Sequence, residues 1–243
     1  MIPQKSSTQL IFASDDWNEC YSSIKEKWNQ EYVISCADFG RDQYCIVMNK
    51  GTDWGEQNIL ISNDFPYFDI NDYWDRRLDI THIFRDKNSW YLVFTGDTPA
   101  SGQEWQYKQS FGDIKRFIRT LWGQRKFISA CYQHENNYFM LMSGGPECKQ
   151  KWVISQVVPE NIMSGNYLKE LNWFITCLAE IDGKLMKVFS SATAIQEQFI
   201  LRSTNMNDLA DKLDEYWEKG YFISNCAFVR EDLYIVFSKY VVS

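Results

Sequence analysis

VISCADFGRDQYCIVMN, residues 33–49, returns near the other end of the chain as FISNCAFVREDLYIVFS, residues 222–238. Both stretches consist of two β-prone runs separated by residues that favour a tight turn. Three further copies fall into the same frame, at spacings of 46, 48, 47 and 48 residues between successive anchors. The anchors are Ile34, Ile80, Ile128, Ile175 and Ile223. The chain is therefore expected to build five units of about 47 residues each.

Each copy keeps the same residue types at fixed distances from its anchor. A small hydroxyl residue follows every anchor and an aliphatic residue stands thirteen positions after it, as Ser35 and Val47 do in the first copy. Turn formers such as Gly, Asp and Asn lie between them. The pattern predicts a strand, a tight turn and a second strand. The anchor should lie in the core, and the hydroxyl should bond to the backbone between neighbouring units.

A third β-prone segment belongs to each unit and begins at a Gln in four copies. The segments are QLIFAS, QNILIS, QKWVIS and QFILRS, and the remaining copy has WQYKQS from Trp105 to Ser110. Before the next anchor, apolar residues four apart, such as Ile118 and Trp122, predict a short helix. A Trp stands six residues before the anchor in four units, whereas the remaining unit has Lys169 there. Each unit should thus contain three strands and a helical connection.

The two ends of the chain carry complementary parts of the repeat. The N-terminal part supplies a third strand and a helix without a preceding hairpin, and the C-terminal part ends soon after a hairpin. We therefore expect a mainly β protein with short helices, folded as a single repeat domain over residues 1–243. The units would form a five-bladed β-propeller-like ring, closed by pairing the N-terminal strand with the C-terminal hairpin, so that residues 7–28 complete the last blade. An open solenoid is the alternative architecture.

The amino-acid composition limits the classes of partner that the protein can bind and the cellular compartment in which we expect it. The hydrophobic fraction of 45% is enough to fill a sizeable core, and the aromatic fraction of 16% is unusually high. The formal net charge of −7 disfavours binding to nucleic acid and to anionic membranes. The seven Cys include no C-x-x-C pair, and we find no secretory leader pattern and no apolar run long enough to span a bilayer. These features predict a cytoplasmic protein with reduced thiols.

One segment of the repeat carries a family resemblance. The repeat resembles a domain of unknown function found in plant casein-kinase-type proteins and cyanobacterial multidomain proteins, with a consensus close to GxGxQxWxxSxxFPxxxIxxxWxxGYxIT. The matching residues are Gly55, Gln57, Ser62, Phe65, Pro66, Ile70, Trp74, Ile80 and Thr81, and in the last repeat Trp217, Gly220, Tyr221, Ile223 and Ser224. The resemblance implies an accessory recognition region, here as a free-standing module. A weaker analogy, through repeat length and number only, links the chain to tachylectin-type five-bladed lectins.

Two sets of side chains are candidate ligand-binding residues. The first set is the Gln that opens a third strand, at Gln9, Gln57, Gln150 and Gln198. Each amide either fixes the backbone or offers one of several equivalent sites to a ligand such as a sugar. The second set is Trp17, Trp54 and Trp105, which break the repeat. Such Trp side chains stack on a sugar face or form part of a protein interface.

A metal site is a minor alternative. The second residue after each anchor is Cys36, His82, Ala130, Cys177 or Asn225. In a closed ring these positions would approach one axis, where Cys36, His82 and Cys177 could form a zinc set. Cys is also a common small buried residue, and two of the five positions carry poor ligands. We therefore predict no metal and no cofactor.

Function is expected to be recognition rather than catalysis. The sequence has no G-x-S-x-G, no phosphate-binding glycine loop and no H-E-x-x-H, and its only His residues are His82 and His134. A small hydrolase with two carboxylates remains a third hypothesis. We predict a non-catalytic module that binds a protein partner, for example as an accessory or regulatory subunit. The alternative is a multivalent lectin that binds glycans through equivalent sites.

Overall fold

The computed structural model of the protein describes residues 8–145, 148–156, 172–191, 194–204 and 206–240. In these ranges the chain forms five three-stranded antiparallel sheets with short helices between their strands. Each sheet is built from one contiguous stretch of sequence, which we call a unit. The predicted class, mainly β with short helices, is confirmed.

The elements follow the order third strand, helix, hairpin in each unit. The strands are β1 (Thr8–Ser14), β2 (Tyr32–Gly40) and β3 (Gln43–Lys50) in unit 1; β4 (Gln57–Ser62), β5 (Asp79–Arg85) and β6 (Trp90–Thr95) in unit 2; β7 (Ser101–Lys108), β8 (Lys126–His134) and β9 (Asn137–Gly144) in unit 3; β10 (Gln150–Ser155), β11 (Phe174–Ile181) and β12 (Lys184–Ser190) in unit 4; and β13 (Ile195–Ser203), β14 (Phe222–Val229) and β15 (Asp232–Tyr240) in unit 5. The described helices are α1 (Trp17–Trp28), α2 (Asp69–Asp75), α3 (Phe111–Trp122) and α5 (Met206–Glu218). Lys169, which replaces the repeated Trp in the sequence, lies outside the described residues.

The second strand of each hairpin lies in the middle of its sheet. In unit 1 the order is β1-β3-β2, and β1 pairs with β3 from Thr8 opposite Lys50 to Ser14 opposite Tyr44. The C-terminal hairpin pairs with β13 instead. The predicted pairing of the N-terminal strand with the C-terminal hairpin is therefore wrong, and residues 8–28 complete the first unit rather than the last.

The crossover helix explains this pairing. β1 and β2 both run antiparallel to β3, so they run parallel to each other on its two sides. Parallel strands of one sheet need a long crossover connection, and α1 supplies it. The strand that begins at a Gln therefore belongs with the hairpin that follows it in the sequence.

A β-bulge interrupts every inner strand, by which we mean the first strand of each hairpin, directly after the anchor. In unit 1 Ile34 pairs with Met48 and Cys36 pairs with Val47, so Ser35 is the extra residue. The Ser35 hydroxyl donates to the Val47 carbonyl at 3.3 Å, which lies in the same sheet and not in a neighbouring unit as predicted. Because the bulge shifts the alternation of the strand, Ile34 and Cys36 face opposite sides of the sheet.

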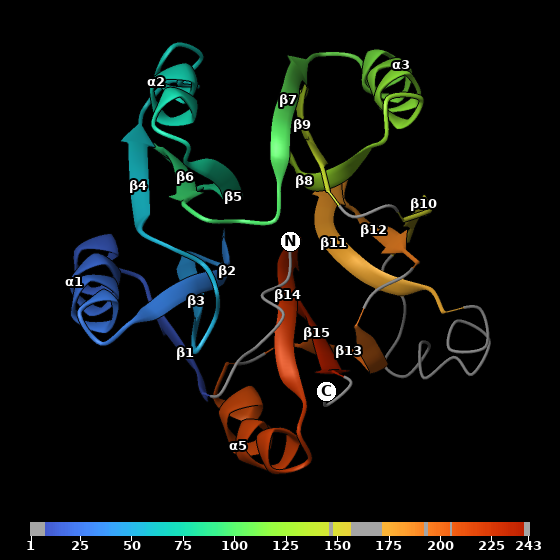
Figure 1. Ribbon diagram of the computed structural model, residues 1–243. Coiled ribbons are helices and arrows are strands. Elements are labelled where there is room, and N and C mark those ends of the chain that lie inside the picture. Colours follow the sequence, from blue (N-terminus) through green and yellow to red (C-terminus); the bar gives the residue numbers. More distant parts are fainter. Residues whose placement is uncertain (1–7, 146–147, 157–171, 192–193, 205, 241–243) are drawn as a thin grey trace.

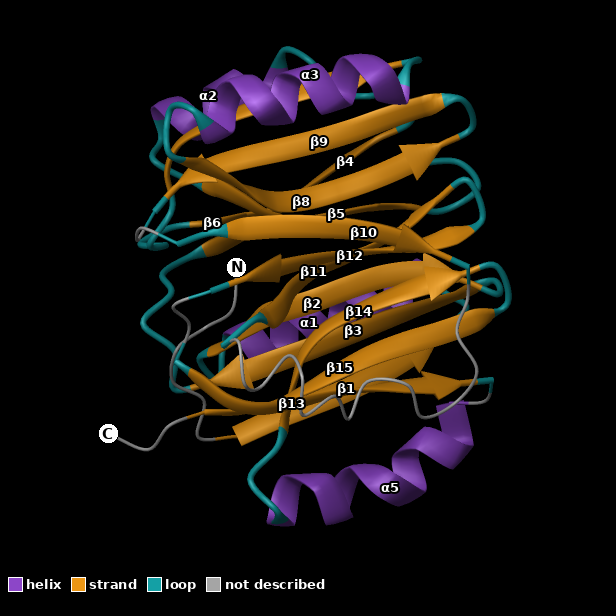
Figure 2. Cartoon of the chain, turned by 90° about the vertical axis from the view of Figure 1, so that its right-hand side faces the viewer, coloured by secondary structure: helices purple, strands orange, loops and turns teal. Residues whose placement is uncertain are grey.

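The five sheets lie around a common centre, with the helices at the periphery (Figure 1). Each inner strand contacts the inner strands of two other sheets, in the order β2, β5, β8, β11, β14 and back to β2. A side view shows α3 and α5 on opposite outer sides of the molecule, with the strands between them (Figure 2). The inner strands therefore meet in the middle of the protein.

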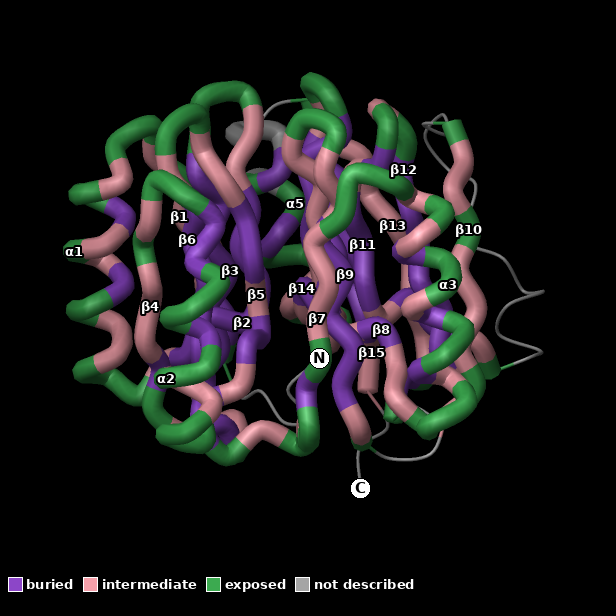
Figure 3. Tube along the Cα trace, turned by 90° about the horizontal axis from the view of Figure 1, so that it is seen from above, coloured by how far each residue is buried: buried purple, intermediate pink, exposed green. Residues whose placement is uncertain are grey.

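The hydrophobic core lies mostly between neighbouring units rather than within one sheet. One cluster combines Ile34 and Met48 of unit 1 with Phe84 and Tyr91 of unit 2. Buried residues concentrate in the inner and middle strands, whereas the outer sides of the helices are exposed (Figure 3). Because each sheet buries its apolar faces against its two neighbours, a single unit would leave much of its core open to water.

Candidate functional site

Five Gln side chains join each sheet to the sheet before it, and we call these contacts the glutamine bridges. In the bridge of Gln57, Oε1 accepts hydrogen bonds from the Ile34 backbone N–H at 2.6 Å and from the Trp28 indole at 3.1 Å. Nε2 donates to the Ile34 carbonyl and to the Thr95 hydroxyl, both at 3.0 Å. One buried amide thus satisfies both backbone groups of an anchor residue in the neighbouring sheet.

The same geometry recurs at the other four junctions. The bridges from amide oxygen and amide nitrogen to the anchor backbone are Gln9 to Ile223 at 2.7 and 2.8 Å, Gln103 to Ile80 at 2.8 and 2.9 Å, Gln150 to Ile128 at 2.7 and 3.0 Å, and Gln198 to Ile175 at 2.6 and 2.9 Å. Trp217, Trp74 and Trp122 add the indole bond to Gln9, Gln103 and Gln150. The repeated Trp is therefore a donor that completes each of these bridges.

The bridges bear on the first set of candidate ligand-binding residues. Gln9, Gln57, Gln150 and Gln198 all use their amides to hold neighbouring sheets, so a ligand would have to displace framework bonds. Their role in binding stays a prediction, and the alternative role as backbone anchors accounts for their contacts. Sequence reasoning missed Gln103, because WQYKQS was chosen as the segment in that unit. The signal was its distance of 25 residues to the next anchor, which Gln9, Gln150 and Gln198 share.

The three candidate Trp residues lie in different parts of the fold. Trp54, between β3 and β4, is buried, with 8% of its surface exposed. Trp17 starts α1, and its ring packs on Tyr91 with centroids 4.4 Å apart. Trp105, on β7, is half-buried and is the one of the three that adjoins an exposed aromatic surface. The proposed binding roles of these Trp residues stay predictions.

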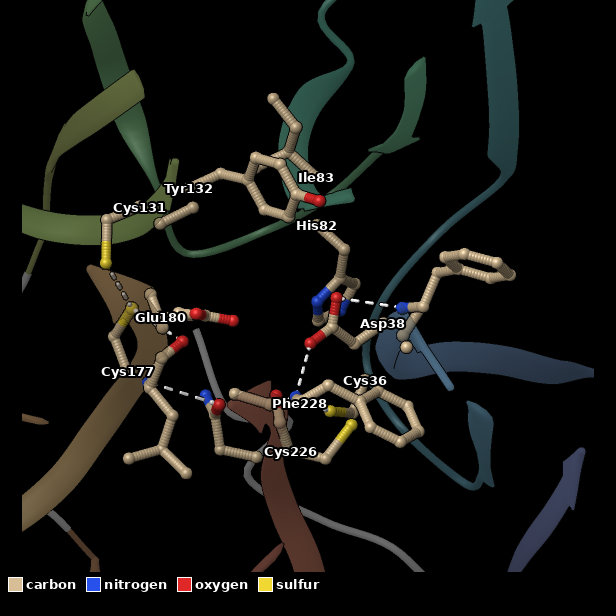
Figure 4. Close-up of a pocket in the computed structure, with 18 of the residues that line it drawn as sticks. Cys36, Asp38, His82, Ile83, Cys131, Tyr132, Cys177, Glu180, Cys226 and Phe228 are labelled. Atoms are coloured by element: carbon tan, nitrogen blue, oxygen red, sulfur yellow. Dashed lines mark hydrogen bonds between the residues drawn. The ribbon is translucent and has the colours of Figure 1, made fainter. Parts of the chain in front are cut away.

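A cavity of about 280 Å³ lies where the five inner strands meet (Figure 4). Its lining includes all five residues that stand two positions after an anchor: Cys36, His82, Ala130, Cys177 and Asn225. Sequence reasoning expected these positions to approach one axis, and they do line one cavity. The exposed Arg230 also lines it, so the cavity reaches solvent at that end. Its volume lies near the lower limit for ligand pockets, which favours a small ligand.

Asp38 is the most buried carboxylate of the cavity, with 9% of its surface exposed. Its Oδ1 accepts from the Phe39 backbone N–H at 2.8 Å, and its Oδ2 accepts from the Phe228 N–H of unit 5 at 2.7 Å. Burial raises the pKa of Asp38 to about 7, against these two hydrogen bonds, and the charge of Glu180 adds to the rise. Within the described residues no Lys, Arg or His forms an ion pair with Asp38.

His82 lines the same cavity with a nitrogen that has no partner. Burial lowers the pKa of His82 to about 3, so the imidazole is neutral at physiological pH, although a hydrogen bond to the Ile34 backbone opposes the shift. A neutral imidazole carries its proton on one ring nitrogen and has a lone pair on the other. Nε2 is buried and has no hydrogen-bond partner among the described residues. In the tautomer that carries the proton on Nδ1, this nitrogen offers an unused lone pair.

Two further oxygen-bearing groups line the cavity beyond Asp38 and His82. The Tyr132 hydroxyl donates to the Arg85 carbonyl at 3.2 Å, which leaves its oxygen lone pairs available. The Glu180 carboxylate accepts from the Arg230 backbone N–H at 3.2 Å. Both residues turn toward the middle of the cavity in Figure 4. The cavity thus presents mainly hydrogen-bond acceptors.

Thiols make up much of the remaining lining. Cys131 and Cys177, from adjacent inner strands, have their sulfur atoms 3.5 Å apart, and the Cys36 thiol approaches the Cys226 carbonyl at 3.9 Å. All seven Cys of the chain are in the described ranges and all are free thiols. Among the residues that the structure describes, no three His, Cys, Asp or Glu side chains are grouped so as to hold a metal ion. The set Cys36, His82 and Cys177 therefore lines the cavity without forming such a group.

An aromatic cluster reaches the surface between units 2 and 3. We define it as Phe65, Tyr67, Trp105 and Tyr107, whose rings contact one another, together with Phe68, which follows Tyr67 in the chain. Phe65 stacks on Tyr107 at 4.5 Å between centroids, and Tyr67 lies 5.6 Å from Trp105. Phe68 is 87% exposed and Tyr67 is 45% exposed. Phe68 is also the N-cap of α2, where it provides no side-chain hydrogen bond.

The fold and these sites define a β-sheet repeat protein of five similar units. The family model of a domain of unknown function, DUF7477, matches residues 6–104 and again residues 75–241. The chain belongs to this family, and the two overlapping matches agree with the internal repeat. No curated protein matches the chain. In the described part of the chain, no helix is long and apolar enough to cross a membrane.

Proposed function

We propose that the five units form a closed, five-bladed β-propeller-like ring that works as a non-catalytic recognition module for a protein partner. Two observations support closure. The inner strands contact one another in cyclic order, with β14 against β2. The bridge from Gln9 to Ile223 joins the first unit to the last with the same geometry as the other four bridges. Such a ring is rigid, because every sheet is held on both sides.

The observation that carries the recognition role is the aromatic cluster, and in particular Phe68. A large aromatic side chain that is 87% exposed gains nothing from the fold, and it occupies an N-cap that Ser, Thr, Asp or Asn would stabilise. Tyr67 lies beside it on a base of Phe65, Trp105 and Tyr107 that is already packed. Exposed aromatic residues on a rigid base are the usual anchors of protein interfaces.

Charge around the cluster indicates the chemistry of the partner. Asp64, Asp69 and Asp72 are exposed and flank Phe68 in the sequence. An interface that buried Phe68 would bring these carboxylates to its rim, where complementary charge steers association. We therefore propose a partner with an apolar pocket bordered by Lys or Arg residues.

Two features support a non-catalytic role and a location in the cytoplasm, which we propose as well. The imidazole of His82, with its pKa lowered to about 3 by burial, is a weak base at neutral pH, which supports a non-catalytic role. The seven free thiols support residence in a reducing compartment such as the cytoplasm.

The test is affinity purification of the tagged protein from its native cells, with the wild type compared with Phe68→Ser. Val153→Ser is the matched control, because Val153 is 45% exposed on β10, in a different unit. Co-purifying chains are identified by mass spectrometry and then tested with purified proteins. We expect a stoichiometric partner with wild type and Val153→Ser, and at least a tenfold weaker Kd with Phe68→Ser.

Other results would contradict the proposal in distinct ways. A partner that binds Phe68→Ser as tightly as the wild type would exclude the aromatic cluster as the interface. Recovery of mixed glycoproteins that one free sugar releases would favour the lectin alternative. If a second copy of this chain were the only partner recovered, the aromatic cluster would serve self-association and not the recognition of another protein.

A further inference from the structure

The central cavity has an incomplete set of polar partners. Asp38 is a buried carboxylate without a cationic partner in the described chain, and His82 Nε2 is a buried nitrogen without a hydrogen-bond partner there. Burying a charge or an acceptor without a partner is unfavourable, and buried carboxylates in proteins are generally paired. The two groups come from different units and line the same open space. Something with hydrogen-bond donors would complete both.

Most other polar groups of the lining already have partners. The amide oxygen of Asn225 accepts from the Leu178 N–H at 3.2 Å, and its nitrogen donates to the Thr176 carbonyl at 3.4 Å. The hydroxyl proton of Tyr132 is donated to Arg85, away from the cavity groups. Apart from Arg230 at the solvent end, the remaining polar capacity is therefore mainly that of acceptors: the carboxylate of Asp38, Nε2 of His82, the oxygen of Tyr132 and the carboxylate of Glu180.

We propose that the central cavity binds a small organic cation that carries an ammonium or guanidinium group, with Asp38 as its counter-ion and His82 Nε2 as a second acceptor. Both cations have several N–H donors and no acceptor, which complements the acceptors that Asp38 and Glu180 offer in the cavity. Glu180 accepts from the backbone N–H of Arg230, so these two opposite charges both lie at the solvent end of the cavity. Asp38, His82 and Glu180 turn toward the cavity from β2, β5 and β11 (Figure 4).

The size of the cavity limits the ligand. At roughly 30 Å³ per water, about 280 Å³ holds on the order of nine waters. An amine or guanidine of a few heavy atoms fits this space, whereas a sugar chain does not. The site is separate from the aromatic cluster, which lies on the surface between units 2 and 3. The inference therefore goes beyond the proposed protein recognition and does not depend on it.

The charge state of Asp38 makes binding depend on pH. A cation binds the ionised carboxylate, and burial raises the pKa of Asp38 to about 7. The groups that face it are Glu180 on β11, Tyr132 on β8, the neutral His82 on β5 and the Cys226 thiol on β14. None of these four supplies a positive charge near neutral pH. Arg230, which also lines the cavity, is exposed at its solvent end and forms no ion pair with Asp38 among the described residues. Affinity for a cation should therefore rise from pH 5 to pH 8 by about 100-fold, following the ionised fraction of Asp38.

The probe is methylguanidinium, with methylurea as the neutral molecule of the same shape, added at matched ionic strength and followed by NMR titration of the ¹⁵N-labelled full chain. We expect saturable binding of methylguanidinium at pH 8, a shift of the His82 Nε2 resonance on binding, and no saturation at pH 5. Asp38→Asn should weaken binding at pH 8 by at least tenfold. Asp42→Asn is the matched control, because Asp42 is an exposed carboxylate of the same hairpin, and it should leave binding unchanged.

Several results would overturn the proposal. Equal binding of methylurea would show that charge is not recognised, and binding that survives Asp38→Asn would place the cation elsewhere. Absence of any shift of His82 would mean that the cavity stays empty of the probe. If Asp38→Asn does not fold, the pH dependence and the His82 resonance of the wild type decide the question. Capture of the partner through Phe68 is measured separately, so failure of one proposal leaves the other standing.

Discussion

The junctions between sheets and the lining of the central cavity both recur at equivalent positions in every unit. The junctions use the same residue in all five units, whereas the cavity lining uses different residues. All five junctions use Gln, with an anchor Ile as the recipient. The cavity position two residues after the anchor is Cys, His, Ala, Cys or Asn. Identical geometry requires identical chemistry where the backbone of the next sheet must be satisfied. Where side chains line the cavity, the fold allows different residue types in different units. The cavity can therefore hold a set of groups that is not repeated, such as Asp38 and His82.

The largest expected effect tests the glutamine bridges, which are the same in every unit. Gln57→Ala removes four hydrogen bonds and leaves the backbone N–H and carbonyl of Ile34 buried without partners. We expect the free energy of unfolding to fall by about 3–5 kcal/mol, measured by urea denaturation.

The control for this change is Gln43→Ala, which removes an exposed Gln from the start of β3. Its effect should be within about 0.5 kcal/mol. If the two variants were equally stable, the glutamine bridges would not hold the sheets together.

An intermediate effect concerns Asp38 in the lining of the central cavity, where the residues differ between units. This effect depends on pH. Burial raises the pKa of Asp38 to about 7 in the folded protein from an ordinary value of 3.8. The folded state then binds a proton more tightly than the unfolded state, so the contribution to stability is present at low pH and is lost as the pH rises through about 7. Between pH 5 and pH 7 the loss is about 2 kcal/mol.

This loss is measured as the difference in pH dependence between the wild type and Asp38→Asn, by urea denaturation at each pH. Asp42→Asn should keep the full pH dependence of the wild type. A wild-type protein that gains stability relative to Asp38→Asn on going from pH 5 to pH 7 would reverse the sign and contradict the burial of an unpaired carboxylate.

The smallest expected effect sharpens the difference between framework and surface aromatic residues. Phe68→Ser should change the free energy of unfolding by no more than about 0.5 kcal/mol, because the side chain is 87% exposed. Phe65→Ala, three residues earlier, should cost about 3–5 kcal/mol, because that ring is buried against Tyr107. Thermal or urea unfolding of both variants checks this, and a large loss at Phe68 would give it a structural role in place of a binding one.

Much of the local structure followed from the sequence. The hairpins, the anchors in the core and the helix around Ile118 and Trp122 lie where the repeat predicted, because these features depend on residues close together in the chain. The partner of the N-terminal strand did not follow, because β1 could have paired with a free edge at either end of the sequence. The missed Gln103 shows the same limit: its strand is irregular, with a register shift between Ser101 and Glu104.

The candidate sites were less accessible to sequence reasoning. The sequence singled out Trp105, but not Tyr67 or Phe68, since exposure depends on how the loop before α2 lies against unit 3. It grouped the five cavity positions correctly but gave no weight to Asp38, because the residues around Asp38 form no recognisable functional motif. Burial without an ionic partner is a property of several strands together, and no single strand reveals it.

By itself, the sequence determined the number of units, their spacing and the residues that repeat, because equivalent buried positions recur at a regular interval along the chain. Only the tertiary structure decided which strand pairs with which hairpin, that Gln holds an anchor in the preceding sheet, and that Asp38 and His82 share one cavity. These outcomes depend on contacts between residues from 22 to 214 positions apart in the chain. Such contacts form through the packing of whole sheets, and local sequence preference does not specify them.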